Sequence, residues 1–304
     1  MKMNDKFDKI AESKQSSKFT SIDVDHREAQ IYIPSNQKKR QIINDTTYAF
    51  ILRNEILMQI KKLIQQNKKC KVIELGCGSG WLSLEMARFG AEVIGYDTSI
   101  KMIQIANKMK KENKIKKNFG SLKYINQDME KFEAKKDSID LIISWESLYF
   151  AKNPNLIMKK IKEALKINKY LIIVQSTKQR AFEKYISYLF ELFLPTYNRS
   201  YKEKFILVYS SLTKKSLKRQ IKYYISNKDF YYRYSKIVEN IKKDYQIISY
   251  KKDLAFCSIP MIRLNFKNKI LRYYTQYFLK KIDDFLCFFK FVNGTRNYYC
   301  LKKK

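Results

Sequence analysis

Short apolar runs alternate with longer amphipathic segments through the middle of the chain. After a polar stretch of some forty residues, apolar side chains between Ile42 and Ile64 recur at helical spacing, which predicts one or two helices. Five runs of strand length follow, and helical stretches separate them. The runs are 71–75, 92–96, 122–127, 139–144 and 170–175, and the helical stretches are 81–89, 100–111 and 156–167. Because strands that alternate with helices form parallel sheets covered on both faces, we expect an α/β fold.

The alternation stops after Ser176. Residues 182–225 have a helical pattern that is interrupted at 195–199, and a helix at 234–243 leads into a strand at 245–250. After the turn at Asn293-Gly294, residues 295–301 are predicted to form a final edge strand.

A helix is also predicted at 270–289, and one of its faces is apolar. That face carries Leu271, Tyr274, Phe278, Ile282, Phe285, Leu286 and Phe289. We expect the stripe to be buried against the sheet, and the alternative is a helix that lies on a membrane surface.

A chain of 304 residues can form one good core and a second small lobe. We divide it into an N-terminal arm or lid at 1–40, a cofactor-binding core at 41–175, a helical insertion that caps the acceptor at 176–228, and a C-terminal completion of the core at 229–304. His26 lies in the arm, where it is either part of a lid or a solvent-facing side chain.

The formal net charge of +33 suggests an anionic partner such as nucleic acid. Lys outnumbers Arg by 51 to 11, however, which is typical of AT-rich coding sequences, so part of the charge can be compositional. The charge is also uneven, because residues 176–304 carry 29 basic and 9 acidic groups, a net +20. The later part of the chain is therefore the better candidate for an anionic partner.

The five cysteines are scattered and lack the spacing of a metal or redox site, so we expect reduced thiols and no metal. No apolar run approaches the roughly 20 residues that a membrane span needs, and the first residues lack a secretory signal. We expect a cytoplasmic protein, for which peripheral membrane contact stays possible.

Three of the seven glycines fall within five residues, at Gly76, Gly78 and Gly80. They follow a predicted strand and open a predicted helix, where a charged part of a ligand can meet free backbone N–H groups. Glycine lets such a loop turn sharply and lets the ligand touch the backbone. The alternative is a strand-to-helix turn without a ligand.

The spacing of these glycines distinguishes between nucleotide cofactors. A dinucleotide fingerprint needs a third Gly or Ala three residues after the second, but Trp81 stands there and the third glycine comes one residue earlier. The run Glu74-Leu75-Gly76-Cys77-Gly78-Ser79-Gly80 resembles motif I of class I S-adenosylmethionine-dependent methyltransferases. The resemblance continues through 81–83 and 90–97, covers the region from 42 to 175, and is to the type-11 group that acts on small molecules.

This resemblance implies S-adenosyl-L-methionine as the cofactor and a Rossmann-like fold. The expected fold is a seven-stranded, mostly parallel sheet with helices on both faces, an antiparallel last strand and a helical cap inserted after the fifth strand. The residues that would bind the cofactor are Glu74, Gly76, Cys77, Gly78, Gly80, Asp97, Thr98, Asp128, Met129 and Ser144.

By the same resemblance, Asp97 accepts both ribose hydroxyls, Asp128 binds the adenine amine, Met129 packs on the ring, and Glu74 supports the methionine end. Asp97 can instead cap the helix that begins at Ile100. Cys77 is interpreted as a small residue in a tight turn, and the alternative is a nucleophile.

The stretch 144–150 follows the fourth strand, at the edge of the sheet where open α/β folds hold ligands. In small-molecule members of the family it lines the space between cofactor and acceptor. Glu146 or Tyr149 can take a proton from the attacking group as a catalytic residue, or either can simply shape the pocket.

Three functions are compatible with these patterns. The first is methyl transfer by in-line displacement to O, N or C of a small-molecule or lipid-linked acceptor. The second is an RNA methyltransferase, favoured by tyrosines interleaved with basic residues, namely Tyr223, Tyr224, Tyr231, Tyr232 and Tyr234. The third is a non-catalytic binding protein that keeps the fold. The sequence names neither the acceptor nor the oligomeric state.

Overall fold

The computed structural model describes residues 48–113, 119–176, 200–212, 228–253, 268–289 and 296–304, together with 189 and 192. The predicted arm at 1–40, with His26, lies outside these residues, as do the turn at Asn293-Gly294 and most of the helical stretch 182–225. Within that stretch the structure describes one helix, α9 (Tyr201–Leu212).

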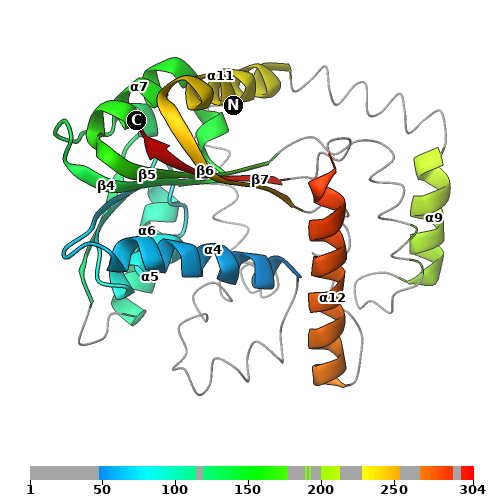
Figure 1. Ribbon diagram of the computed structural model, residues 1–304. Coiled ribbons are helices and arrows are strands. Elements are labelled where there is room, and N and C mark those ends of the chain that lie inside the picture. Colours follow the sequence, from blue (N-terminus) through cyan, green and yellow to red (C-terminus); the bar gives the residue numbers. More distant parts are fainter. Residues whose placement is uncertain are drawn as a thin grey trace.

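One sheet of seven strands organises the described part of the chain, in the order β3-β2-β1-β4-β5-β7-β6 (Figure 1). Five strands pair in parallel: β1 (Lys71–Leu75), β2 (Glu92–Asp97), β3 (Ser121–Asn126), β4 (Ile139–Trp145) and β5 (Leu165–Ser176). The strand β7 (Arg296–Lys303) runs antiparallel to both β5 and β6 (Tyr245–Asp253). The predicted Rossmann-like fold class is thereby confirmed.

The position of the last strand differs from the prediction. We expected an edge strand, but β7 lies between β5 and β6, and β6 forms the edge. The burial of β7 explains the difference, since Tyr298 and Leu301 are both fully enclosed by the two hydrophobic layers of the core.

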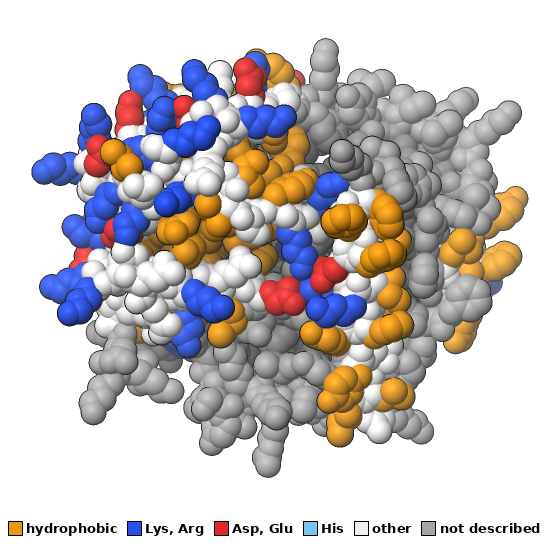
Figure 2. Space-filling model, viewed as in Figure 1, with side chains coloured by type: hydrophobic (Ala, Val, Ile, Leu, Met, Phe, Trp, Pro, Cys, Tyr) orange, Lys and Arg blue, Asp and Glu red, His pale blue; other side chains and the backbone are white. Residues whose placement is uncertain are grey.

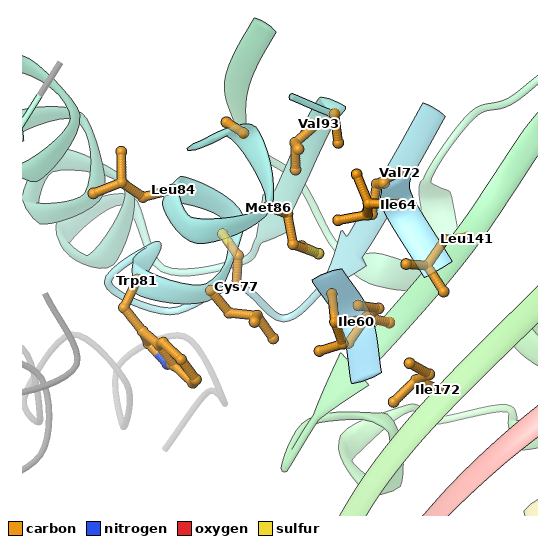
Figure 3. Packing of buried hydrophobic residues seen from close by; sticks show 14 of the residues in the cluster. Ile60, Ile64, Val72, Cys77, Trp81, Leu84, Met86, Val93, Leu141 and Ile172 are labelled. Carbon is orange, nitrogen blue, oxygen red and sulfur yellow. The ribbon is translucent and has the colours of Figure 1, made fainter. Parts of the chain in front are cut away.

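Helices cover both faces of the sheet (Figure 1). One face packs against α4 (Tyr48–Gln65), α5 (Trp81–Arg88) and α6 (Ile100–Asn113), and the other packs against α7 (Pro154–Ala164) and α11 (Lys228–Asp244). Figure 3 shows how Ile60 and Ile64 of α4 meet the sheet at Val72 and Leu141. These layers fix the carboxyl ends of β1, β2 and β4 at one edge, where the candidate site lies.

Helix α7 is shorter than predicted. Asn153 caps its first turn by accepting the N–H of Leu156, and Pro154 stands at the first helical position, where its missing N–H is harmless. We predicted that this helix extends to residue 167. In the structure α7 ends at Ala164, because Leu165 pairs with Ile139 of β4 and the backbone there hydrogen-bonds to the sheet rather than within a helix.

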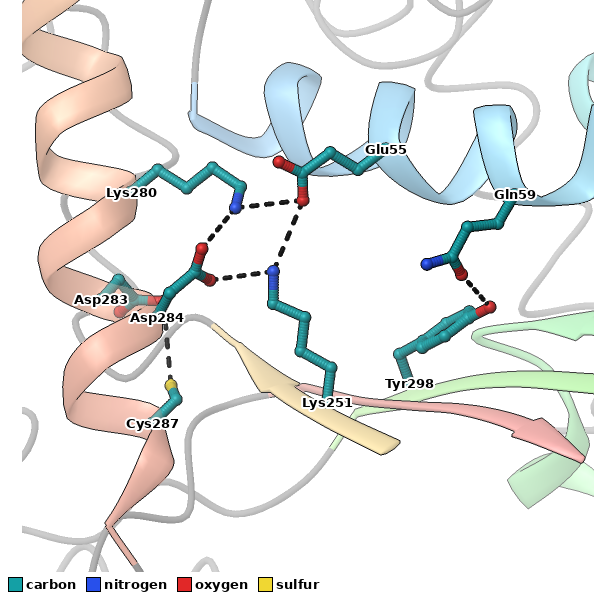
Figure 4. Close-up of polar contacts among 8 residues, drawn as sticks. All are labelled: Glu55, Gln59, Lys251, Lys280, Asp283, Asp284, Cys287 and Tyr298. Atoms are coloured by element: carbon teal, nitrogen blue, oxygen red, sulfur yellow. Dashed lines mark hydrogen bonds and ion pairs between the residues drawn. The ribbon is translucent and has the colours of Figure 1, made fainter. Parts of the chain in front are cut away.

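Helix α12 (Lys269–Phe288) contradicts the prediction that its aromatic stripe is buried. Four residues of the stripe are 51% to 65% exposed and the other three are partly exposed, while Lys280, Asp283 and Cys287 are buried. The inward face is polar because it meets charged partners: Lys280 Nζ lies 3.0 Å from Glu55 of α4 (Figure 4). No helix among the described residues has the length and apolar character to cross a bilayer.

Candidate cofactor and acceptor site

The glycine loop connects β1 to α5, and all three of its glycines have positive φ, at 72°, 52° and 79° for Gly76, Gly78 and Gly80. The N–H groups of Gly76 and Cys77 both donate to the Tyr96 carbonyl, at 2.8 and 2.9 Å. These bonds tie the loop to the end of β2.

The surroundings of the three glycines differ. A Cβ on Gly76 would lie 2.3 Å from Ser147 Cβ, and one on Gly80 would lie 2.4 Å from the hydroxyl of Tyr124. A Cβ on Gly78 would meet nothing within 4 Å. The backbone is therefore open at Gly78, directly before the N-terminus of α5, and a ligand can approach it there.

The carboxylate of Asp97 lies at this open point. Its Oδ2 accepts the N–H of Gly78 at 2.8 Å, and its Oδ1 accepts the N–H of Ser99 at 2.9 Å. The residue that caps α6 is Ser99, whose hydroxyl accepts the N–H of Met102. Asp97 thus links the end of β2 to the glycine loop, and the half-buried Thr98 follows it.

Glu74 lies beneath the loop and is fully buried, and the hydroxyl of Ser83 donates to its carboxylate at 2.5 Å. Cys77 is buried beside it. Burial raises the pKa of the Cys77 thiol, and the carboxylates of Glu74 and Asp97 raise it further. Because the thiolate is the nucleophilic form, this environment favours a packing role for Cys77.

Asp128 and Met129 follow β3. The Asp128 carboxylate accepts the N–H of Glu130 at 2.9 Å and so caps the short helix η2 (Met129–Lys131). The methyl group of Met129 would lie 3.6 Å from a Cβ on Gly76. Met129 is therefore a neighbour of the glycine loop.

The segment after β4 is fixed to β1 through two serines. The hydroxyls of Ser144 and Ser147 lie 2.7 Å apart, and Ser147 donates to the Leu75 carbonyl at 2.5 Å. Ser147 was not among the predicted site residues, although its position three residues after Ser144 could have indicated it. The pair places residues 144–150 directly beside the glycine loop.

The predicted catalytic residues lie in this segment. Glu146 has a φ of 54°, a left-handed conformation that is uncommon for a residue with a side chain, and its N–H donates to the Val174 carbonyl at 2.7 Å. Tyr149 lies in the short helix η3 (Leu148–Phe150), which contacts β5 and α11. Both side chains are partly exposed.

A buried arginine borders the same segment. One guanidinium nitrogen of Arg296, at the start of β7, lies 4.0 Å from the Glu146 carboxylate, and the guanidinium carbon lies 5.8 Å from the ring centre of Trp145. Trp145 also meets Trp81 edge to face at 5.3 Å. No local motif indicates Arg296, because it stands 150 positions after Glu146 in the sequence.

Two buried amides lie on the other face of the sheet, the one that packs against α11. Gln175 of β5 and Asn297 of β7 are register partners, and they are 1% and 6% exposed. Among the residues that the structure describes, both amide atoms of Gln175 and the Oδ1 of Asn297 lack a hydrogen-bond partner, whereas Asn297 Nδ2 donates to Tyr234 of α11 at 2.6 Å. Buried polar groups without partners are uncommon in folded proteins and point to a missing ligand or water.

Within the described residues, no three or more His, Cys, Asp and Glu side chains gather in a way that could hold a metal ion. The candidate site is built instead from backbone N–H groups, carboxylates, hydroxyls and aromatic rings.

Comparisons with known proteins show which family the chain belongs to. A family model described as a methyltransferase domain matches residues 66–249. The ubiquinone biosynthesis O-methyltransferase of Pelagibacter ubique is 31% identical over 119 residues, which are 39% of this chain and 46% of that protein. The protein of the same name from Actinobacillus pleuropneumoniae is 31% identical over 121 residues, 38% of this chain and 49% of the relative. The chain thus spans about half the length of these curated relatives.

Among solved structures, a geranyl diphosphate C-methyltransferase from Streptomyces coelicolor has a TM-score of 0.51 at 10% identity, covering 98% of both chains. At that identity the likeness shows the fold alone. The family model covers more than half of the 304 residues, and its match includes the glycine loop, Asp97, Asp128 and residues 144–150. The chain therefore belongs to the class I S-adenosylmethionine-dependent methyltransferases.

Proposed function

We propose that this protein transfers a methyl group from S-adenosylmethionine to a hydroxyl oxygen of a small-molecule acceptor. The observation that carries the proposal is the corner where the open backbone of Gly78 meets the carboxylate of Asp97. The curated relatives that match are named as O-methyltransferases of ubiquinone biosynthesis, which supports oxygen as the reacting atom.

The residues present fit the cofactor. An ionised carboxylate has about four acceptor positions, so Asp97 can accept ribose hydroxyls while it holds Gly78. Asp128 and Met129 would contact the adenine, and the buried Glu74 would place negative charge near the cofactor's ammonium group. The opening at Gly78 leaves room for the part of the cofactor that crosses the loop.

S-Adenosylmethionine supplies an electrophilic methyl group on a sulfonium, so the protein must mainly align the acceptor and exclude water. The paired rings of Trp81 and Trp145 form an apolar wall beside the glycine loop. Glu146 and Tyr149 are the candidates to take the acceptor's proton, because both lie in the segment that Ser147 fixes to β1.

We assign the recognition of the acceptor's polar groups to Gln175 and Asn297. Both lie on the face of the sheet that packs against α11, and η3 with Tyr149 contacts the same helix and β5. An acceptor that carries a hydroxyl next to a second oxygen would satisfy the Gln175 amide, which has one donor group and one acceptor atom.

Calorimetric titration with S-adenosylmethionine tests the cofactor site. We expect Asp97→Ala to weaken binding by about 10- to 100-fold, the range for losing hydrogen bonds to a charged group. Asp137→Ala is a matched control, because this carboxylate pairs with Lys303 away from the site. If the unmodified protein does not bind S-adenosylmethionine, the proposal is wrong.

Formation of S-adenosylhomocysteine tests the proposed hydroxyl acceptor separately from cofactor binding. We expect the protein to form S-adenosylhomocysteine with catechols in preference to the corresponding thiols and amines. A protein that binds the cofactor but releases no S-adenosylhomocysteine with any phenol or catechol would contradict the hydroxyl acceptor and leave the cofactor site standing.

A further inference from the structure

Helix α12 has its apolar side chains on the outside and its polar side chains on the inside. The outer side chains are 39% to 83% exposed, and we call them the α12 apolar face: Ile270, Leu271, Tyr274, Tyr277, Phe278, Phe285 and Phe288. On the opposite side, Lys280, Asp283 and Cys287 are buried. Soluble helices normally have the reverse arrangement, and an exposed apolar face of this size marks an interaction surface.

A network of ion pairs fixes this orientation (Figure 4). Lys280 Nζ lies 2.5 Å from Asp284 and 3.0 Å from Glu55 of α4. Lys251 of β6 lies 2.9 Å from Asp284 and 3.4 Å from Glu55. Turning the helix to bury its aromatic side chains would separate these four groups, so the apolar face points outward.

The charges on α12 are segregated as well. Its two acidic residues are Asp283, which is buried, and Asp284, which is held by the two lysines. Lys281 is on the outer side, where its Nζ lies 5.3 Å from the ring centre of Tyr277. The outer surface of the helix therefore combines apolar, tyrosine and cationic groups, within a part of the chain that carries a net +20.

Helix α9 repeats the pattern. Tyr201, Phe205, Ile206 and Tyr209 are exposed, while Lys204 and Val208 are buried. Figure 2 shows hydrophobic side chains in a column over α12 and again over α9, at the same end of the molecule.

We propose that α12 and α9 attach the protein to the surface of a membrane that contains anionic phospholipid. Aromatic and aliphatic side chains enter the boundary between head groups and acyl chains, and Lys281 beside them meets the phosphates. A second copy of the chain fits this surface less well, because it would bring two strongly positive regions together. The attachment is independent of methyl transfer.

Sedimentation with vesicles tests the proposal on the full chain. We expect binding to phosphatidylcholine vesicles that contain about 30 mol% phosphatidylglycerol, and much weaker binding to phosphatidylcholine alone. The triple variant Phe278→Ser, Phe285→Ser, Phe288→Ser should bind the anionic vesicles at least about tenfold more weakly. The control variant Met58→Ser, Leu156→Ser, Ile167→Ser changes three exposed apolar residues on other elements and should bind as the unmodified protein does.

Thermal unfolding of the triple variant should match that of the unmodified protein, since all three rings are exposed. The proposal is overturned if the unmodified protein does not bind anionic vesicles at low salt, or if the triple variant binds them equally well. It is also overturned if the unmodified protein is a dimer that the triple variant dissociates while vesicle binding is absent, because α12 would then be a subunit interface.

Discussion

At the residue scale, Gly76 and Gly78 have different surroundings, although both have a left-handed backbone conformation with positive φ. Gly76 is enclosed, since a Cβ there would overlap Ser147, whereas the space above Gly78 is open. The same substitution should therefore damage the fold at one position and ligand binding at the other.

We expect Gly78→Ala to lower the free energy of unfolding by only about 1 kcal/mol, the cost of a left-handed alanine, and to weaken S-adenosylmethionine binding by about tenfold or more. Gly76→Ala should lower the free energy of unfolding by about 3 kcal/mol, because the clash adds to the strain. Denaturant unfolding and calorimetry measure both quantities. Equal losses of stability in the two variants would contradict the structure.

Gln175 provides a second prediction at this scale. Replacing its buried amide with the similarly sized leucine should raise the free energy of unfolding by about 1 kcal/mol, because unpaired polar atoms are removed. It should also raise the KM for a catechol acceptor without changing S-adenosylmethionine affinity. Gln59→Leu is the matched control and should be destabilising, because Gln59 accepts the hydroxyl of the buried Tyr298 at 2.6 Å. A destabilised Gln175→Leu variant would show that the amide has a structural role.

At the scale of elements, the ion pairs among Glu55, Lys251, Lys280 and Asp284 join α12 to α4 and β6. Burial by itself would raise the pKa of Asp284, but hydrogen bonds from Lys280 and Lys251 outweigh it, so the pKa is lowered. A carboxylate with a lowered pKa stabilises the fold above its unfolded pKa, near 3.9, and loses that contribution as the pH falls through the folded value.

We therefore expect Asp284→Asn to cost about 2 kcal/mol at neutral pH, since it leaves the buried Lys280 with one carboxylate instead of two. The difference in unfolding free energy between variant and unmodified protein should shrink as the pH falls below about 4. Urea unfolding of both proteins at several pH values measures this difference in unfolding free energy. A difference that stays constant down to pH 2 would be inconsistent with this ion pair.

At the scale of the whole molecule, local signals predicted the part of the fold that carries the candidate cofactor site. The glycine spacing and the alternation of strands with helices up to Gln175 indicated the parallel half of the sheet. Each strand and each helix there has a recognisable spacing of apolar residues. The order of β6 and β7 could not be predicted, since strand pairing depends on contacts distant in sequence. The orientation of α12 was predicted wrongly, because its apolar stripe was assigned to the core without regard to Lys280 and its partners.

The residues of the candidate site likewise fall into those with a local sequence signal and those without one. The candidate residues at the ends of β1, β2 and β3 belong to local motifs, so the sequence could propose them. Arg296, Gln175 and Asn297 come close to the end of β5 only through the pairing of β5 with β7, so no local pattern indicated them.

The net charge of the whole chain gives a last prediction, about RNA. We expect any binding of single-stranded RNA to be lost between about 50 and 200 mM salt, because phosphate contacts without base recognition depend steeply on counterion release. Fluorescence anisotropy with a labelled oligonucleotide measures the dependence. Affinity that persists above that range would favour the RNA methyltransferase over the small-molecule enzyme.

The insertion of β7 between β5 and β6 has a consequence for biosynthesis. A chain emerges from the ribosome in sequence order, so β6 is made before the strand that joins it to the rest of the sheet. Until β7 follows, the outer edge of β5 keeps its backbone groups unpaired and open to other nascent chains. The sheet beyond β5 therefore cannot be completed until β7 has been translated.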